Sequence, residues 1–169
     1  NHQKKVWRDK MTGESKKLRT AVVGVGYLGH FHAQKHKALI DLCQLVAVVD
    51  GNEQRAKQVA EELSVEALTD YKKLLGKVDA VTIASTTSSH YEIGKFFIGE
   101  GVHVNIEKHM TVTSQEAAEL CQLAEANNVK LQVGHIERFN PALIAAQEKI
   151  KAPLFIEVDR LAEFKPRGV

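Results

Sequence analysis

The chain has 169 residues, of which 44% are hydrophobic and 26% are charged, and these proportions are typical of a folded globular protein rather than of collagen, a coiled coil or a disordered chain. The longest uninterrupted apolar run, Leu45–Val49, is far shorter than the roughly 20 residues that span a bilayer, so no membrane partner is expected. Two cysteines make no disulfide framework and the N-terminus shows no signal-peptide pattern, which favours a cytoplasmic location.

Charge is distributed unevenly along the chain. Residues 1–19 have a net charge of +5, whereas residues 20–169 have a net charge of −3. We interpret residues 1–17 as a basic flexible tail that is solvated. Binding of nucleic acid by this tail is the alternative, and we expect no nucleic-acid partner.

In the first half of the chain, short apolar runs alternate with amphipathic segments. The pattern predicts a strand over 18–25, a helix over 28–39, a strand over 45–49, a helix over 53–63, a short strand over 65–68 and a short helix over 71–75. Asn52 is expected to cap the second helix. The apolar stripe of that second helix is Ala56, Val59, Ala60 and Leu63. On the first helix, the residues that follow one another at helical spacings of three and four positions are Leu28, Phe31, His32, Lys35 and Leu39.

The alternation continues to residue 133. We predict a strand over 78–84, a helix capped by Ser88 or Ser89 that runs to about Gly99, a strand over 102–106, a helix from Thr113 to about Asn127 and a strand over 129–133. Thr113 and Glu116 have the spacing of a capping box. The side chains expected to face inward on this last helix are Ala117, Leu120, Cys121 and Ala124.

The strands predict a doubly wound parallel α/β sheet, the Rossmann fold. They are continuously apolar rather than alternating, which indicates burial on both faces by the intervening helices. After residue 139 the pattern changes: Asn140-Pro141 begins a helix to about Ile150, and Leu154–Phe164 alternates like a strand with one wet face. We therefore predict a nucleotide-binding domain over 18–139 and the start of a truncated α+β substrate domain over 140–169.

A glycine motif lies between the first predicted strand and helix. Gly24-Val25-Gly26-Tyr27-Leu28-Gly29 fits G-x-G-x-x-G, and Asp50 ends the next strand 21 residues after Gly29. In a dinucleotide site, Gly24 permits the tight turn, Gly26 lets the backbone approach the pyrophosphate, and Gly29 allows close helix packing. The helix N-terminus offers amides to the phosphates. A strand–helix turn with packing glycines is the alternative interpretation.

Asp50 is the candidate ligand of the adenosine ribose. A carboxylate here accepts hydrogen bonds from the ribose hydroxyls and repels a 2′-phosphate, which favours NAD over NADP. Gly51 stands where a basic residue would favour the phosphate, although Arg55 lies one helical turn further on. A helix-capping or strand-end role for Asp50 is the alternative.

Polar residues follow two later strands, where an open α/β sheet binds its ligand. Ser85–His90 follows one strand, and Glu107 and Lys108 follow the next. Lys108 is the candidate for orienting a substrate hydroxyl or carbonyl. His90 is either a ligand contact or simply a histidine in the first turn of a helix.

The other histidines do not indicate a metal site. His32 and His36 have i,i+4 spacing on the first helix, near His30. No Glu or Cys completes a zinc pattern such as H-E-x-x-H. We therefore expect no bound metal.

Taken together, these motifs resemble the glucose–fructose oxidoreductase/inositol dehydrogenase (Gfo/Idh/MocA) family of NAD(P)-dependent oxidoreductases. The segments that carry the resemblance are Ala21–His30, Val49-Asp50, Ala84–His90, Glu107-Lys108 and Val133–Pro141. The last of these is similar to the family's crossover into its substrate domain, particularly in members placed in nucleotide-sugar metabolism.

The resemblance implies a role for each candidate residue. The glycine turn, with Tyr27 and Leu28, and Asp50 are expected to bind NAD. The residues that border the nicotinamide would be Ser85, Thr86, His90 and Glu107, and Lys108 would be catalytic, helping to position the substrate and move its proton. His109 and Thr86 stand where the family often has proline.

We accordingly predict the cofactor-binding portion of an NAD-dependent oxidoreductase. It would transfer hydride to nicotinamide from a secondary alcohol of a sugar or nucleotide sugar. Because the family's second domain supplies an acid–base pair and often mediates association, we expect little turnover by this chain alone and a homo-oligomer through that domain. A non-catalytic dinucleotide-sensing or protein-interaction module on the same scaffold is the alternative.

Overall fold

The computed structural model describes residues 17–147, 149–159 and 161. The chain divides into two units between Val133 and Gly134. The described part of the first unit holds a complete sheet with its covering helices, and the described part of the second holds a 3₁₀ turn and one helix. None of the helices in the described ranges is long and apolar enough to cross a membrane.

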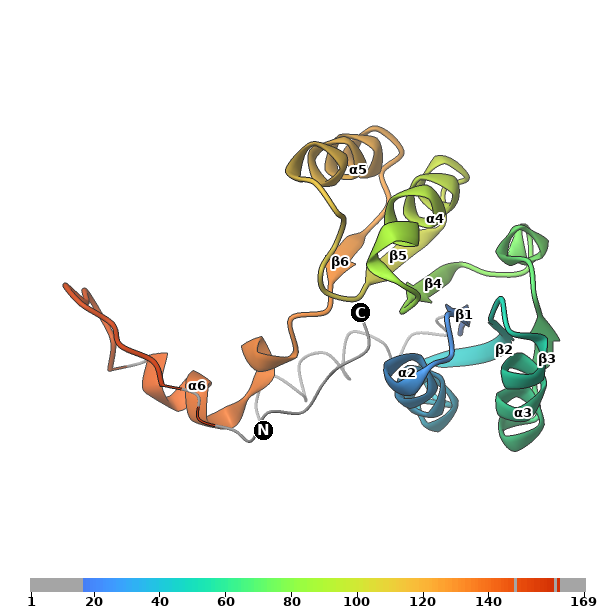
Figure 1. Cartoon of the computed structure of the whole chain (residues 1–169), viewed down its shortest axis with the longest axis horizontal. Coiled ribbons are helices and arrows are strands. Elements are labelled where there is room, and N and C mark those ends of the chain that lie inside the picture. Colours follow the sequence, from blue (N-terminus) through green and yellow to red (C-terminus); the bar gives the residue numbers. More distant parts are fainter. Residues whose placement is uncertain (1–16, 148, 160, 162–169) are drawn as a thin grey trace. The chain divides into compact units, whose positions relative to one another are not determined.

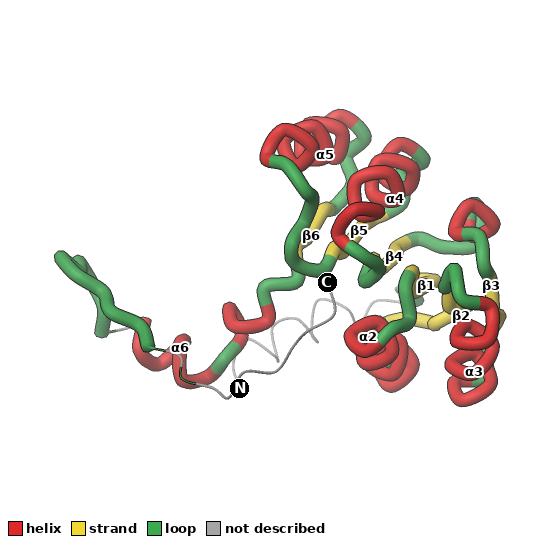
Figure 2. The backbone as a smooth tube through the Cα atoms, viewed as in Figure 1, coloured by secondary structure: helices red, strands yellow, loops and turns green. Residues whose placement is uncertain are grey.

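The first unit is built on a parallel sheet in which strands alternate with helices along the chain (Figure 2). Its strands are β1 (Leu18–Val23), β2 (Cys43–Val49), β3 (Glu66–Leu68), β4 (Ala80–Ile83), β5 (His103–Ile106) and β6 (Leu131–Val133). They follow the order β3-β2-β1-β4-β5-β6, and every pair is parallel. The order reverses between β1 and β4, which confirms the predicted doubly wound fold.

Helices cover both faces of this sheet (Figure 1). Helices α2 (Tyr27–Ala38) and α3 (Glu53–Leu63) lie on one face, and α4 (Thr87–Gly99) and α5 (Ser114–Ala126) lie on the other. The short helix η1 (Tyr71–Leu74) packs on the α4 side through Leu74. Two predicted caps are confirmed: Asn52 accepts from the Arg55 amide at 3.0 Å, and Thr113 forms the capping box with Glu116.

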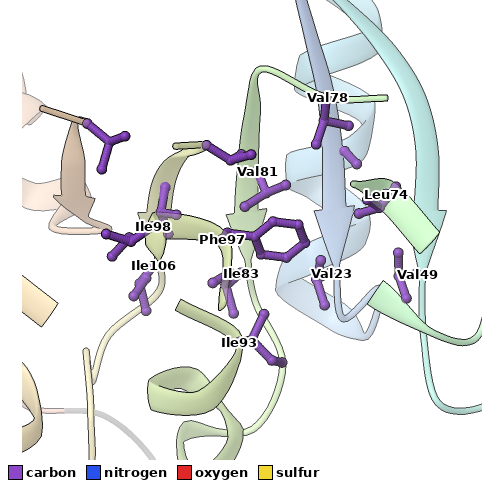
Figure 3. Packing of buried hydrophobic residues seen from close by; sticks show 14 of the residues in the cluster. Val23, Val49, Leu74, Val78, Val81, Ile83, Ile93, Phe97, Ile98 and Ile106 are labelled. Carbon is purple, nitrogen blue, oxygen red and sulfur yellow. The ribbon is translucent and has the colours of Figure 1, made fainter. Parts of the chain in front are cut away.

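Two hydrophobic cores result, one on each face. Successive residues of β1 alternate between them, so Ala21 and Val23 join Phe97 of α4 while Val22 joins Val59 of α3. Figure 3 shows Phe97 among Val81, Ile83 and Val23.

A register shift in β2 keeps the second core continuous. Thr20 pairs with Leu45 but Ala21 pairs with Ala47, so Val46 is one extra residue in β2. As a result Leu45 and Val48, three positions apart, face the same core on the α2 and α3 side. The predicted stripe of α3 is buried there as well.

The buried face of α2 differs from the predicted stripe. Gly29 and Ala33 are its buried residues, whereas Leu28, Phe31 and Leu39 are each more than 40% exposed. The small side chains bring the helix axis close to the sheet, and the large apolar residues are left on the outer side. Hydrophobic periodicity alone could not indicate this, because it ranks a helix face by apolarity rather than by how closely it can approach.

Two further predictions of side-chain placement are wrong. Cys121 is exposed, and Leu123 packs instead against the core beside Leu120 and Ala124. Helix α4 begins two or three residues earlier than expected, with Thr86 rather than Ser88 or Ser89 at its N-cap.

The second unit contains η2 (Ile136–Phe139) and α6 (Pro141–Gln147). The predicted helix start is confirmed, since Asn140 Oδ1 accepts from the Ala142 amide at 2.9 Å. The predicted strand over Leu154–Phe164 is not formed in 154–159 or at 161, and its other residues lie outside the described ranges. A strand requires a neighbour for its hydrogen-bond ladder, and no described strand pairs with this segment.

A half-buried histidine makes the stability of the first unit depend on pH. His36 of α2 contacts both β1 and β4, with Nδ1 3.0 Å from Thr20 Oγ1 and Nε2 3.3 Å from Thr82 Oγ1. Burial, together with the nearby His32, lowers the pKa of His36. The folded chain therefore favours neutral His36, whereas the unfolded chain binds a proton at a pH of about 6.5.

We predict that the free energy of unfolding falls as the pH drops below about 6.5, and that His36→Gln removes part of this dependence. The stability contribution of neutral His36 is complete above that pH and is lost as the pH approaches the lower, folded pKa. Urea unfolding of both proteins across pH 8 to 5 measures the two slopes. Parallel slopes would contradict the assignment.

Candidate functional site

The predicted site residues gather at one edge of the sheet. Gly24 follows β1, Asp50 follows β2, Ser85 comes after β4, and Glu107 follows β5. Because all of these strands are parallel, their carboxyl ends lie at the same edge, beside the point where strand order reverses. The topology therefore brings together residues that are far apart in the sequence.

Two glycines of the turn are required by close packing. Gly24 has φ +84°, and a Cβ there would lie 2.5 Å from the Ser85 amide nitrogen. A Cβ on Gly29 would lie 1.7 Å from the Gly24 carbonyl oxygen. The turn after β1 is thus pressed between α2 and the loop after β4, which leaves no room for side chains.

Gly26 is different, because the fold gives no reason for a glycine there. Its backbone is extended, with φ −67° and ψ −158°, and among the described residues no heavy atom lies within 4 Å of a Cβ built on it. An ordinary side chain would fit the protein but would fill the space above the turn. This open space is what a pyrophosphate needs in order to approach the backbone.

The N-terminus of α2 opens onto the same space. Gly26 is the N-cap and has no side chain to accept from the first-turn amides, and no acidic residue occupies the first turn. Tyr27 and Leu28 begin the helix and are 82% and 43% exposed. Amides at such a helix end, with the positive end of the helix dipole, favour a bound anion.

The carboxylate of Asp50 joins β2 to the glycine turn. Oδ2 accepts from the Val25 amide at 3.0 Å, and Oδ1 accepts from the Asn52 amide at 2.9 Å. Asp50 is only 8% exposed, whereas Arg55, whose Nη1 lies 3.5 Å from Oδ2, has a half-exposed side chain. Oδ2 therefore has two donors, whereas Oδ1 has one and keeps a further lone pair that could accept from a ligand hydroxyl.

Hydroxyl groups line the loop between β4 and α4. Ser89 Oγ donates to the Thr86 carbonyl at 2.8 Å, so the 2.7 Å contact between Ser85 Oγ and Ser89 Oγ has Ser85 as donor. Thr86 Oγ1 lies within 3.4 Å of Ser88 and Ser89. The loop is held by its own hydroxyls, and Gly24 packs against its backbone at Ser85.

His90 lies inside the protein rather than at the surface of the crevice. It is 1% exposed; Nδ1 is 2.8 Å from the His109 carbonyl oxygen and Nε2 is 3.1 Å from the Ser85 carbonyl oxygen. Both ring nitrogens thus face backbone carbonyls of two different loops. The geometry favours a helix histidine that joins these loops, and direct contact with a cofactor stays a prediction.

Glu107 is buried and Lys108 is exposed. Glu107 Oε1 lies 2.8 Å from His32 Nε2, and Oε2 accepts from the Lys108 amide at 3.2 Å. The main chain of Glu107 is fixed as well, since its amide donates to the Ile83 carbonyl at 2.9 Å. Lys108 therefore follows a firmly held residue and directs a cation outward at the end of β5.

Two hollows among the described residues of the first unit contain none of the predicted site residues. One of about 740 Å³ is lined by residues of β2, α3 and β3, and one of about 340 Å³ lies between α4 and α5. The carboxyl edge is the better candidate, because within the part of the chain that the structure describes, an open backbone turn, a helix N-terminus and a buried carboxylate meet only there.

Comparison with known proteins agrees with this geometry. Residues 18–135 match the family model described as the oxidoreductase family with an NAD-binding Rossmann fold, GFO_IDH_MocA. The chain belongs to this oxidoreductase family. The resemblance and the fold predicted from the motifs are thereby confirmed.

Individual relatives and solved structures of this family are also similar. UDP-N-acetylglucosamine 3-dehydrogenase of Acidithiobacillus ferrooxidans is 42% identical over 90% of this chain and 48% of its own length. Scyllo-inositol 2-dehydrogenase (NAD(+)) of Bacillus subtilis is 33% identical over 80% and 40%. This family member thus spans about half the length of the curated relatives that it matches.

Among solved structures, that of the Acidithiobacillus ferrooxidans enzyme has a TM-score of 0.74 at 40% identity, covering 80% of this chain and 44% of its own. Scyllo-inositol dehydrogenase from Lactobacillus casei, with NAD(H) and scyllo-inositol bound, has a TM-score of 0.75 at 25% identity, covering 80% and 41%.

Two histidines of the present chain have partners that the sequence did not indicate. From the sequence, His32 has only a place at helical spacing and a part in the rejected metal pattern, yet in the structure it pairs with Glu107, and His30 pairs with Glu62 of α3 at 2.8 Å. In the described ranges no three His, Cys, Asp or Glu side chains are grouped to hold a metal ion. One sequence signal was available: His32 lies three residues after Gly29, on the side of α2 that approaches the sheet.

Alanine substitutions at Gly29 and Gly26 should distinguish a glycine that packing requires from a glycine that leaves space for a ligand. Gly29→Ala is expected to destabilise the family member by at least about 2 kcal/mol, because the new methyl group overlaps the Gly24 carbonyl and overpacking of this kind is costly. Gly26→Ala is expected to change stability by less than about 0.5 kcal/mol, since its Cβ meets open space. Urea unfolding without ligand measures both, and equal losses would refute the packing argument.

Proposed function

We propose that the first unit binds NAD at the carboxyl edge of its sheet. The pyrophosphate would lie against the amides of Gly26, Tyr27 and Leu28, with the dipole of α2 favouring its charge. Asp50 would accept from the ribose hydroxyls. The observation that carries this proposal is the open space above Gly26. The packing of the protein does not require a glycine at this position.

The nicotinamide half would extend toward the loops after β4 and β5. Ser85, Thr86 and Glu107 would border it, and residues 18–139 would form the NAD-binding domain. Support comes from the strand order, since a dinucleotide lies across the point where the order reverses. Lys108 is exposed at this edge, so its charge would be available to a substrate hydroxyl.

We further propose that the protein to which this unit belongs oxidises a secondary alcohol of a sugar or nucleotide sugar. Bound NAD would supply the hydride acceptor, C4 of its nicotinamide ring. Lys108, as an ammonium, would orient the reacting hydroxyl by a charge-assisted hydrogen bond and stabilise the negative charge that develops on its oxygen, and the proton would pass to the acid–base pair expected in the second domain. The nucleotide-sugar alternative is supported by the 42% identical relative that acts on UDP-N-acetylglucosamine.

Preference for NAD over NADP follows from the surroundings of Asp50. Its buried carboxylate is held in place by the Val25 and Asn52 amides, so it cannot move away from a 2′-phosphate. Arg55 is the nearby cation, and its half-exposed side chain is already directed toward Asp50. We infer that repulsion by Asp50 outweighs attraction by Arg55, because Asp50 is the more buried and the more rigid of the two.

Gly26→Ala tests dinucleotide binding directly. The variant should fold normally but bind NAD at least about tenfold more weakly, because its methyl group occupies the space for the pyrophosphate. Gly99→Ala is the matched control: its Cβ also meets no described atom within 4 Å, but it lies at the far end of α4. Calorimetric titration of the parent and both variants measures the affinities. The proposal fails if the parent does not bind NAD or if Gly26→Ala binds it normally.

Asp50→Asn tests the choice of cofactor. The parent should bind NAD at least about tenfold more tightly than NADP, and the variant should reduce this ratio because the amide carries no charge to repel the phosphate. Titrations with both dinucleotides give the ratio for each protein. Tighter binding of NADP by the parent would show that Arg55 dominates.

A further inference from the structure

Histidines from helices on opposite faces of the sheet hold the segment 107–109 on both sides. His32 belongs to α2 and contacts Glu107, whereas His90 belongs to α4 and contacts the carbonyl of His109. Lys108 is the residue between these two contacts. We propose that His32 and His90 are positioning residues that fix Lys108 at the nicotinamide end of the crevice, an inference that rests on the proposed NAD site.

The contact from α2 is a partly buried His–carboxylate pair. The side chain of Glu107 is 7% exposed and that of His32 is 23% exposed, with 2.8 Å between Oε1 and Nε2. A carboxylate can only accept, so His32 Nε2 is the donor. The other oxygen of Glu107 accepts from the Lys108 amide at 3.2 Å. The carboxylate therefore connects α2 to the backbone of Lys108.

The contact from α4 connects two loops. His90 fills the space between the carbonyls of Ser85 and His109, at 3.1 and 2.8 Å. A neutral imidazole can donate to one of these carbonyls and an imidazolium to both. In either state the ring separates and spaces the loop after β4 and the loop after β5, which are the loops proposed to border the nicotinamide.

Helix α2, which carries His32, also offers an internal comparison. His30 also pairs with a carboxylate, that of Glu62, at 2.8 Å, but the two side chains are 36% and 44% exposed. Glu62 belongs to α3, so this pair joins two helices on one face and does not contact the segment 107–109. His30 and His32 are thus alike in residue type and partner type and differ in what they hold.

Holding the segment matters because Lys108 itself is exposed. A long charged side chain at a loop has many conformations, and fixing its backbone beforehand reduces what must be ordered when a ligand binds. Loss of either histidine should therefore weaken contacts to the nicotinamide end. Contacts of the adenosine and pyrophosphate half, made by the glycine turn and Asp50, should be unaffected.

The test compares NAD with ADP-ribose, which lacks the nicotinamide, in calorimetric titrations of the whole 169-residue chain. His32→Phe should weaken NAD binding about tenfold, because Glu107 loses its donor, and should leave ADP-ribose binding within about twofold. His32→Gln places an amide donor near the position of Nε2 and should restore NAD binding to within about threefold of the parent. His30→Phe, the matched control, should alter neither affinity.

His90 is tested in the same way. His90→Phe keeps an aromatic ring but removes both ring nitrogens, and it should weaken NAD binding more than ADP-ribose binding. His90→Asn retains a donor near the position of Nδ1 and should recover part of the loss; it also serves as the test if His90→Phe does not fold.

The outcomes separate this inference from the proposed function. If the parent binds neither NAD nor ADP-ribose, the proposed function has failed. If the parent binds both, and the His32 and His90 variants change the two affinities equally or not at all, the positioning role is refuted while the proposed site stands. A larger loss of NAD affinity than of ADP-ribose affinity, with NAD affinity recovered in His32→Gln, supports the positioning role. A merely structural defect would not discriminate between the two ligands.

Discussion

The hydrogen bond from the Val25 amide to the Asp50 carboxylate is the contact on which the arrangement of the site depends. It joins the end of β2 to the turn after β1, and the carboxylate is almost completely buried. A charge-assisted bond in such surroundings is stronger than a neutral one. It fixes the path of the backbone between Gly24 and Gly26, and hence the direction of the first amides of α2.

The same carboxylate is the proposed ribose ligand, so one residue would both hold the site together and contact the cofactor. Structural and functional interpretations of Asp50 are therefore not alternatives: the protein contacts that hold its carboxylate would also keep it rigid toward a ligand. Gly24 and Gly29 act in a comparable way, because they allow the turn, the helix and the loop after β4 to approach within backbone contact. Gly26 is the exception that leaves room for a ligand.

Much of the fold could be predicted from local patterns. Helix α3 has the predicted bounds, cap and stripe, since Asn52 and the spacing of Ala56, Val59, Ala60 and Leu63 act within one helix. The capping box at Thr113 is equally local. Predictions were wrong where the answer depended on partners elsewhere: the buried face of α2, the exposure of Cys121 and, in its described residues 154–159 and 161, the expected strand over Leu154–Phe164.

By itself the sequence determined the succession of strands and helices, the glycine turn and the residues at the strand ends, because periodicity and turn chemistry act over a few residues. Only the tertiary structure decided which of those residues touch. Asp50 lies 25 residues from Val25, and His32 lies 75 residues from Glu107. Such contacts depend on strand order and on how closely each helix approaches the sheet, and these properties belong to the packed chain rather than to any short segment of it.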